Sequence, residues 1–232
     1  MIRSIRERKY LLLLAALVLL ATVEPLSVNW PESARIAGNA VVVAINVGIL
    51  LAVFEARWTR RLAVLLLTFL IAANIVYEVS SHRLQIAAII YHCVGAMFLA
   101  FAVAAILKRI FQRQAIRIDD VIGALCGYVL AAAAWGNAYA LVYMLWPESF
   151  RVANTIAPQL GDWHSQRFIF GYFSVMTLTT VGYDDIIPAG PLAYSLIWLE
   201  AVFGQFYIAV VVAQLIGLRL AQVIRRDRSL NP

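Results

Sequence analysis

The chain has 232 residues, of which 63% are hydrophobic and only 14% charged, with a net charge of +6 and a mean hydropathy of +0.82. Soluble domains carry about a quarter of charged residues, so this composition excludes an ordinary soluble protein. An apolar run of about 18 residues or more can cross a ~30 Å hydrocarbon core as a helix. Six such runs predict six spanning helices, at 10–28, 37–54, 62–79, 86–107, 121–146 and 191–218.

The first run, 10–28, follows the basic segment MIRSIRERKY, a combination that secretory signal peptides also show. No small-residue cleavage site follows it, because Glu24-Pro25 and Asn29-Trp30-Pro31 come next. We therefore predict that this run is a retained helix.

The basic residues gather at alternate ends of the six runs. Fifteen of the 19 Lys and Arg residues precede the first run or follow the second, fourth or sixth. Lys and Arg accumulate on the cytoplasmic side of a membrane. The pattern therefore predicts a multi-pass protein of the plasma or inner cell membrane with both termini in the cytoplasm. It also attributes the positive charge to orientation and to contact with membrane lipids, and not to nucleic acid.

Short connections such as SSHR join the first four runs, which predicts a four-helix transmembrane bundle as a first domain, 1–113. The fourth helix of a voltage sensor carries regularly spaced arginines that move through the membrane field. Residues 84–107 contain no Lys or Arg. We therefore expect that this bundle does not sense voltage.

The second domain, 114–232, interrupts its two long runs with a segment of a different kind. FIFGYFSVMTLTT predicts a helix of about 11 residues, too short to span the membrane, and TVGYDDIIPAGP follows without helical character. Irregular backbone at membrane depth must be buried in protein or line a water-filled path. We therefore predict a re-entrant loop, in which Gly182 supplies positive φ and backbone carbonyls replace the hydration shell of a monovalent cation.

The stretch TTVGYDD, with FSVMTLT before it and a glycine-containing helix after it, resembles the filter and pore helix of the potassium channel superfamily. The resemblance covers residues 120–220. It implies an all-α membrane protein with six helices, a re-entrant pore helix and filter between the fifth and sixth, and a homotetrameric pore. This family includes six-helix members, and here the voltage-sensor arginines are missing.

The resemblance assigns roles to individual residues. Those implied to bind K⁺ through their oxygens are Thr180, Val181, Gly182 and Tyr183. Those implied to support the filter or to form its outer mouth are Thr179, Asp185, Tyr172 and Phe173. Met176 stands where some members carry a buried glutamate, and Asp184 stands where the family has its second filter glycine.

Asp184 leaves three interpretations open. Asp reaches the left-handed region at a cost of order 1 kcal/mol, so it can replace the glycine without consequence. Alternatively, loss of the outermost ion site weakens potassium selectivity. In a tetramer, Asp184 and Asp185 would also place eight carboxylates at the outer mouth, where mutual repulsion raises their pKa values and favours divalent or proton block.

The last run carries further candidates. Gly204 is either a hinge or a packing glycine, and Ile208, Val212 and Ile216 either line an inner cavity or form a packing stripe. Glu200 is an acid inside a spanning helix, where ionisable residues are usually functional. We expect that it ties the pore helix by a hydrogen bond.

These observations predict a potassium-conducting cation channel that is not voltage-gated, with K⁺ as the permeant ion and no cofactor. The alternatives are a non-selective or divalent- or proton-regulated cation channel, and a non-conducting subunit that uses the pore fold for assembly. The expected partners are identical chains, monovalent cations, membrane lipids and, for gating, a separate regulatory subunit. We predict that the chain is not an enzyme, since it contains no Gly-x-Ser-x-Gly or His-Glu-x-x-His motif.

Overall fold

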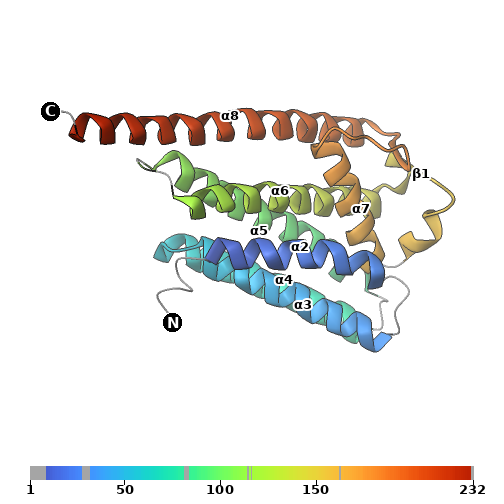
Figure 1. The fold of residues 1–232 in the computed structure, drawn as a ribbon. Helices are drawn as coiled ribbons and strands as arrows, with labels where there is room; N and C mark the ends of the chain where they lie inside the picture. Colours follow the sequence, from blue (N-terminus) through green and yellow to red (C-terminus); the bar gives the residue numbers. More distant parts are fainter. Residues whose placement is uncertain are drawn as a thin grey trace.

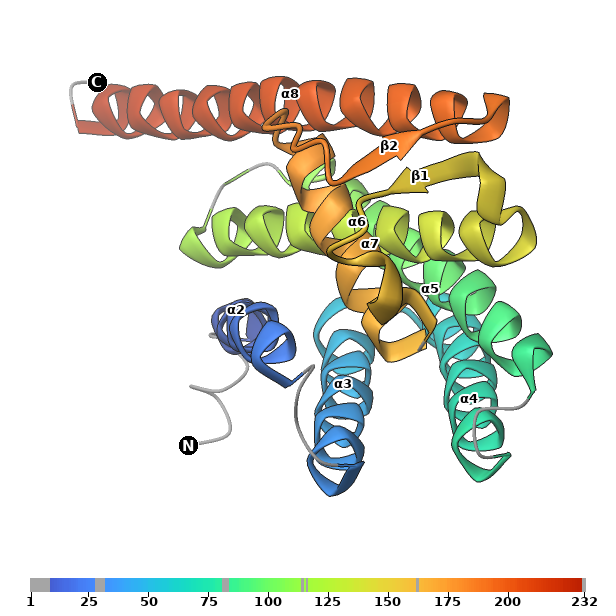
Figure 2. The same cartoon turned by 90° about the vertical axis from the view of Figure 1, so that its right-hand side faces the viewer.

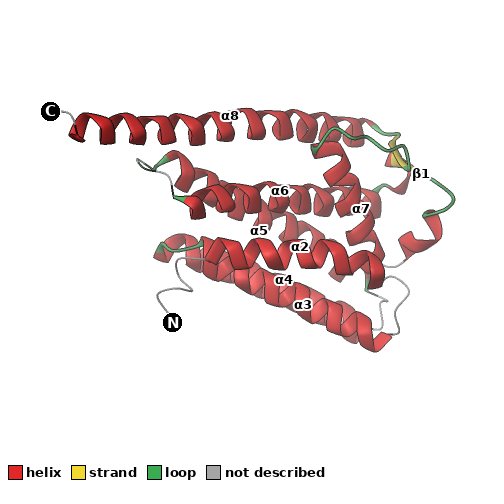
Figure 3. Ribbon diagram, in the orientation of Figure 1, coloured by secondary structure: helices red, strands yellow, loops and turns green. Residues whose placement is uncertain are grey.

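The computed structural model describes residues 9–27, 32–80, 84–113, 115, 117–161 and 163–230. The α-helices are α2 (Lys9–Ser27), α3 (Glu32–Val53), α4 (Arg57–Val79), α5 (Gln85–Phe111), α6 (Ile118–Leu145), α7 (Trp163–Leu178) and α8 (Pro191–Leu230). The remaining elements are η1 (Pro147–Ser149), β1 (Phe150–Val152), η2 (Ala157–Gly161) and β2 (Ile186–Pro188). Figure 3 shows that helices make up most of the structure.

Among the described residues, four helices are long and apolar enough to cross a membrane, namely α4, α5, α6 and the Pro191–Ile224 part of α8. The apolar stretches of the other two long helices are shorter, at Lys9–Val23 in α2 and Gly38–Val53 in α3. The chain is therefore a multi-pass membrane protein, and its six-helix count stays a prediction. Of the basic residues used to orient it, Arg3, Arg6, Arg8 and Arg83 lie outside the described residues.

Helix α6 lies at the centre of the array. In Figures 1 and 2, α8 runs along one side of it, while α2 and α5 lie on the other. Helix α7 is inclined in both views and crosses from the region of α3 and α5 to α8. Helices α2 and α8 respectively begin and end at the same end of the array (Figure 1), and α6 ends at the opposite end, where α8 begins.

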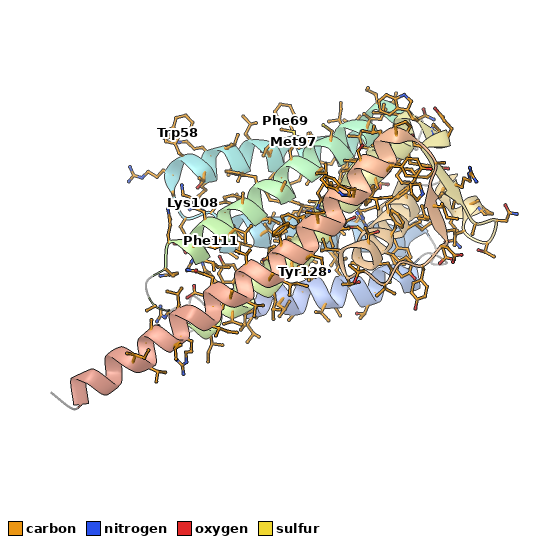
Figure 4. All side chains as sticks on the ribbon, turned by 90° about the horizontal axis from the view of Figure 1, so that it is seen from above. Trp58, Phe69, Met97, Lys108, Phe111 and Tyr128 are labelled. Atoms are coloured by element: carbon orange, nitrogen blue, oxygen red, sulfur yellow. The ribbon has the colours of Figure 1, made fainter. Side chains whose placement is uncertain are left out.

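Apolar side chains cover both the interior and much of the outer surface. One buried cluster runs through α2, α3, α4, α5 and α6 and reaches Tyr207 and Val211 of α8. On the outside, Trp58, Phe69 and Met97 are 81%, 56% and 56% exposed, and Figure 4 shows them projecting from α4 and α5. Such a surface suits hydrocarbon, since contiguous apolar patches of this kind are rare on soluble monomers.

The cluster continues across the boundary at residue 114 that the sequence predicts. Tyr10 of α2 packs on α6, where a Cβ added to Gly123 would lie 3.3 Å from its ring. The Cys126 thiol of α6 donates to the Tyr10 carbonyl at 3.4 Å. The two modules thus share one core, and the division at 113 and 114 stays a prediction.

Three local features differ from the sequence-based expectation. Strands β1 and β2 lie side by side (Figure 2) and pair antiparallel, with Arg151 opposite Ile187, so the fold contains a small two-stranded sheet in addition to its helices. Helix α7 has 16 residues instead of about 11, because it already begins before the apolar FIFGYF stretch. Helix α8 has 40 residues and continues beyond position 218, because its polar, Arg-rich end carries the helix out of the apolar run.

Candidate functional site

The segment that follows α7 is fixed to the last turn of that helix through its backbone. The N–H groups of Val181 and Gly182 both donate to the carbonyl of Met176, at 2.9 and 3.2 Å, and Thr180 N–H donates to Thr177 at 3.0 Å. Because α7 ends at Leu178, its C-terminal carbonyl end lies next to this segment. The helix dipole makes that end favourable for cations.

The backbone changes handedness at every second residue here. Thr180 has φ of 60° and Gly182 has φ of 65°. Glycine reaches this region freely, but a β-branched residue rarely does, and such a conformation costs about 1–3 kcal/mol. Strain of this kind is found where function requires a particular direction of the backbone. The positive φ that the sequence predicted for Gly182 is present, and Thr180 adds a second position that the sequence analysis missed.

Asp184 does not continue this alternation. Thr180 is the non-glycine residue with positive φ among those described, and Asp184 and Asp185 lie in a turn that leads into β2. The Asp185 carbonyl accepts the Ala153 N–H at 2.9 Å. The left-handed conformation that would let Asp184 replace a glycine is therefore not adopted, because the pairing of β1 with β2 directs the chain away after Tyr183.

Residues 179–183, which the resemblance assigns to the filter and its support and which are called the filter segment from here on, are exposed in the single chain. Val181 and Tyr183 are 54% and 57% exposed. Tyr172 of α7 stacks on Tyr183, with ring centroids 6.5 Å apart and an interplanar angle of 10°. Phe173 packs elsewhere, against Tyr139 at 5.2 Å. Of the two pore-helix aromatics, one therefore contacts the filter segment and the other joins the core formed by α6, α7 and the sheet.

A buried carboxylate joins three helices behind the filter segment. Glu200 of α8 is fully buried, and it accepts hydrogen bonds from the hydroxyls of Tyr139 in α6 and Ser174 in α7. Burying a carboxylate is costly unless hydrogen bonds satisfy it. The tie expected from Glu200 is present, and its two donors are residues that the sequence analysis did not name.

Helices α6 and α8 both contact the C-terminal end of α7. The Tyr128 hydroxyl of α6 donates to the Leu178 carbonyl at 2.9 Å. A Cβ added to Gly204 of α8 would lie 2.6 Å from that same carbonyl, closer than atoms can approach. Helix α8 continues without a break through this position, so Gly204 acts here as a packing glycine and not as a hinge.

Further along α8, the four-residue repeat lies on an exposed face. Ile208, Val212 and Ile216 are 47%, 46% and 63% exposed, whereas Tyr207 and Val211 are buried. The repeat therefore faces away from α6, where it is available either to a neighbouring chain or to an inner cavity.

The described residues contain no group of three or more His, Cys, Asp or Glu side chains able to hold a metal ion. A monovalent cation would instead be held as cargo by backbone oxygens, which suits hard cations such as K⁺. Thr180, Val181, Gly182 and Tyr183 remain the predicted ligands, with Thr179 beneath them: its N–H and its hydroxyl both donate to the Val175 carbonyl, at 3.0 and 2.6 Å.

Comparison with known proteins places the same region in an ion-channel context. Residues 140–218 match a family described as "Ion channel", a range that includes α7, the filter segment and most of α8. The inward rectifier potassium channel Kirbac3.1 of Paramagnetospirillum magnetotacticum is 51% identical over 39 residues. This match spans 17% of the present chain and 13% of that relative. No solved structure matches the chain.

Both comparisons support an ion channel rather than an enzyme, and the family match lies within the part of the chain that the resemblance covers. The family match does not include the first 139 residues, which hold α2 to α5 and most of α6.

Proposed function

We propose that this chain forms a potassium-conducting cation channel that is not voltage-gated. The observation that carries the proposal is the change of backbone handedness at Thr180 and Gly182 directly after α7. Alternating handedness turns successive carbonyls toward one side, and a ring of such oxygens replaces the hydration shell of K⁺. The similarity of 39 residues to an inward rectifier potassium channel supports potassium as the ion.

The proposed assembly is a homotetramer with one filter segment from each chain. A single segment offers oxygens from one direction only, whereas a cation stripped of water needs them on all sides. The apolar exposure of Val181 and Tyr183 supports burial against neighbouring copies. So does α8, in which only 17% of an 18-residue apolar stretch is buried within one chain.

The proposed orientation has both termini in the cytoplasm of a cell with a plasma or inner membrane. The start of α2 and the end of α8 lie at one end of the array (Figure 1), and Lys9, Arg57 and Arg109 lie at helix ends on that side. The segment between α6 and α8, which contains α7 and the filter, then enters and leaves from the outer side as a re-entrant loop.

The charges of α5 support the proposed absence of voltage gating. Its basic residues, Lys108 and Arg109, both lie in its last turn, and the Arg109 guanidinium is 2.8 Å from Glu55. Without charges spaced along the membrane-spanning part, a change in membrane potential does little work on this helix. We therefore expect conductance with little dependence on voltage.

A second candidate function is a cation channel with weak selectivity between K⁺ and Na⁺. Its support is Asp184, which does not share the positive φ of Thr180 and Gly182. A glycine with positive φ at this position would direct its neighbouring carbonyl toward the ion and complete the outermost oxygen ring. Without positive φ, Asp184 does not do so. Four copies of Asp184 and Asp185 at the mouth would in addition attract divalent cations.

Reversal potentials decide between the two candidates. The full chain is reconstituted in planar bilayers, and the reversal potential is measured with K⁺ on one side and Na⁺ on the other. A reversal potential far from zero, with the sign that K⁺ permeation requires, supports the first proposal, and a potential of zero at equal concentrations, which means equal permeability, contradicts it. Total lack of ion flux from well-folded protein would instead favour a non-conducting pore-fold subunit.

Asp184→Gly tests the second candidate, because it restores the conformational freedom of glycine. If Asp184 weakens the outermost site, this variant raises the K⁺ to Na⁺ permeability ratio by about tenfold, equivalent to ~1.4 kcal/mol of ion-binding preference. Asp184→Asn is the matched control, since it removes the charge but keeps the side chain. An equal gain in both variants would assign the effect to charge and not to backbone conformation.

A further inference from the structure

A cavity of about 520 Å³ lies between the pore helix and the first four-helix module. Its walls come from α2, α3, α5, α6 and α7, with Leu70 as the contribution of α4. This volume is within the range of about 300–1,000 Å³ that small-molecule sites occupy. The cavity is separate from the filter segment, and no part of the conduction proposal uses it.

The polar groups of the cavity gather at one end. Arg167 of α7 donates to the Tyr91 hydroxyl of α5 at 3.4 Å, and Asn137 of α6 lies 3.0 Å from the His92 ring nitrogen. Among the described residues that line the cavity, the guanidinium is the one charged group. This end therefore combines a guanidinium with the hydrogen-bonding groups of Tyr91 and Asn137.

The remainder of the cavity is apolar. Leu99, Leu130, Ile49 and Val175 line it, and the other polar lining residue, Asn46, donates its amide to the carbonyl of Val42 in its own helix. Arg167 and Val175 are eight residues apart in α7, which corresponds to ~12 Å along the helix. The cavity thus has a cationic end and an apolar length, and it suits an elongated molecule with an anionic head.

One wall of the cavity is the support of the filter itself. Tyr172 lines the cavity and stacks on Tyr183. Val175 lines it as well, and its carbonyl accepts both the N–H and the hydroxyl of Thr179. A molecule in the cavity therefore contacts the two α7 residues that touch the filter segment from behind.

We propose that this cavity binds a single-chain amphipathic anion, such as a long-chain fatty acid, with its carboxylate on Arg167 and its chain along the apolar wall. The planar guanidinium matches a carboxylate in charge and geometry. One alkyl chain fits the volume of a small-molecule site, which distinguishes it from a two-chain phospholipid. The walls are apolar helices of a membrane protein, so the ligand enters from the hydrocarbon.

A consequence for conduction rests on the proposed channel function. Contact with Tyr172 and Val175 changes how firmly α7 supports the filter segment, so occupancy of the cavity changes K⁺ flux. Binding itself does not depend on conduction, and the two parts are measured separately.

Binding is tested with a diazirine-labelled palmitic acid on the full chain in nanodiscs of zwitterionic lipid, and the crosslinks are mapped by mass spectrometry. We expect crosslinks in the cavity-lining parts of α2, α3 and α7. Unlabelled palmitate should compete, and palmityl alcohol should compete at least about fivefold less well, since loss of a charge-assisted hydrogen bond costs more than ~1 kcal/mol. Equal competition by the alcohol or by a diacyl phosphatidylglycerol would overturn the single-chain anion assignment.

Gly171→Leu closes the cavity from the α7 side. A Cβ at Gly171 meets no atom within 4 Å, so the side chain extends into the space and should reduce crosslinking about tenfold. Gly48→Leu is the matched control, because Gly48 of α3 is equally open but does not line the cavity. Equal labelling of both variants contradicts the proposed site.

Arg167→Gln tests the cationic end with a variant that leaves the cavity open. We expect a loss of palmitate labelling of about fivefold or more, partly rescued in Arg167→Lys, and no change in labelling by palmityl alcohol. Equal labelling of Arg167→Gln and the unchanged protein would overturn the role of Arg167. This variant also keeps the proposal falsifiable if Gly171→Leu does not fold.

Flux measurements complete the test. Palmitate should change K⁺ flux through the unchanged protein at least about twofold and leave flux through Gly171→Leu unchanged relative to Gly48→Leu. If palmitate binds at the cavity but the protein conducts no ions, the channel proposal fails and the binding site stands. If the protein conducts and no cavity labelling occurs, the binding site is wrong and the channel proposal stands.

Discussion

Helix α6 has one side toward α7 and α8 and another toward α2 and α5, and the two sides hold their neighbours through different chemistry. Toward α7 and α8, tyrosine hydroxyls make the contacts: Tyr128 donates to the Leu178 carbonyl, Tyr139 donates to Glu200, and Tyr207 of α8 donates to the Ala124 carbonyl at 2.7 Å. Toward α2 and α5, small residues let side chains approach closely, as Gly123 does for the ring of Tyr10. Two hydrogen bonds accompany this packing, from the Cys126 thiol to the Tyr10 carbonyl and between Asn137 and His92.

This difference in contacts corresponds to the helices that each side of α6 positions. Hydrogen bonds are directional, so the tyrosines and Glu200 fix the rotation and depth of α7, and with it the filter segment. Apolar contact is non-directional, and on the side of α2 and α5 it accompanies hydrogen bonds that do not involve α7 or α8. The cavity also lies on that less constrained side, between α2, α3, α5, α6 and α7. Breaking the directional contacts should therefore harm conduction more than disturbing the apolar ones.

Glu200→Leu should have the largest effect. It leaves the buried hydroxyls of Tyr139 and Ser174 without their acceptor, and each unsatisfied group costs about 1–3 kcal/mol. We expect loss of assembled, conducting protein, measured as ion flux and as the thermal stability of the oligomer. Glu200→Gln is the control, because its amide oxygen still accepts hydrogen bonds, and it should retain part of the flux. Wild-type flux in Glu200→Leu would show that this tie does not position α7.

Gly204→Ala should follow in size. The added Cβ would lie 2.6 Å from the Leu178 carbonyl, so α7 and α8 must separate at a cost of about 1–3 kcal/mol. Gly217→Ala in the same helix is the matched control, because a Cβ there meets no atom within 4 Å and alanine favours a helix by ~1 kcal/mol. Thermal unfolding of the two variants measures the contrast, and equal stabilities would return Gly204 to the role of a hinge.

Tyr128→Phe removes one directional contact and leaves the packing unchanged. The hydrogen bond to the Leu178 carbonyl is lost, and we expect a loss of about 1 kcal/mol in the free energy of unfolding together with reduced K⁺ selectivity. Tyr194→Phe serves as control, because Tyr194 of α8 is 54% exposed. If both variants have wild-type reversal potentials, the hydrogen bond from Tyr128 to the Leu178 carbonyl does not influence the filter.

Some features of the helices and of the candidate site could be predicted from the sequence, and others could not. Apolar runs located every long helix, and the position of Gly182 after a short helix predicted positive φ there. Both predictions succeed because they depend on local composition and on local backbone preference. Glu200 was identifiable as an acid in an apolar helix, but its donors were not. Tyr128 and Tyr139 are eleven residues apart in α6, three turns that place both on one face, and this spacing was the available signal.

Other features depend on contacts between distant segments. No sequence pattern in either three-residue strand predicts the pairing of Arg151 with Ile187. This pairing places Asp184 in a turn and not in the positive-φ conformation that a glycine would adopt. The role of Gly204 also depends on a contact with a distant segment. A helix bend and a close approach of two helices both favour glycine, so the sequence alone does not distinguish them. Its distance to the Leu178 carbonyl, 2.6 Å from the added Cβ, separates the two interpretations.

The smallest effect should come from the ion-pair cluster around Glu55, on the α2 and α5 side. Glu55 lies 2.6 Å from the Lys9 ammonium and 2.8 Å from the Arg109 guanidinium, so it joins the start of α2 to the end of α5. The hydrogen bond from Lys9 holds the pKa of Glu55 below its ordinary value of 4.5, against the opposing effect of burial. A carboxyl whose folded pKa is lowered stabilises the protein above its unfolded pKa, and this contribution is lost as the pH falls through the folded pKa.

The size of that contribution is limited because the Glu55 side chain is 62% exposed, and solvent screens such pairs to below about 1 kcal/mol. Thermal unfolding at about pH 6 and about pH 3.5 compares the chain with Glu55→Gln. The unchanged protein should lose slightly more stability on acidification, because other carboxylates titrate equally in both. Parallel curves would mean that the ion pair contributes nothing, and a large difference, or loss of conduction in Glu55→Gln, would mean that this side of α6 also depends on directional contacts.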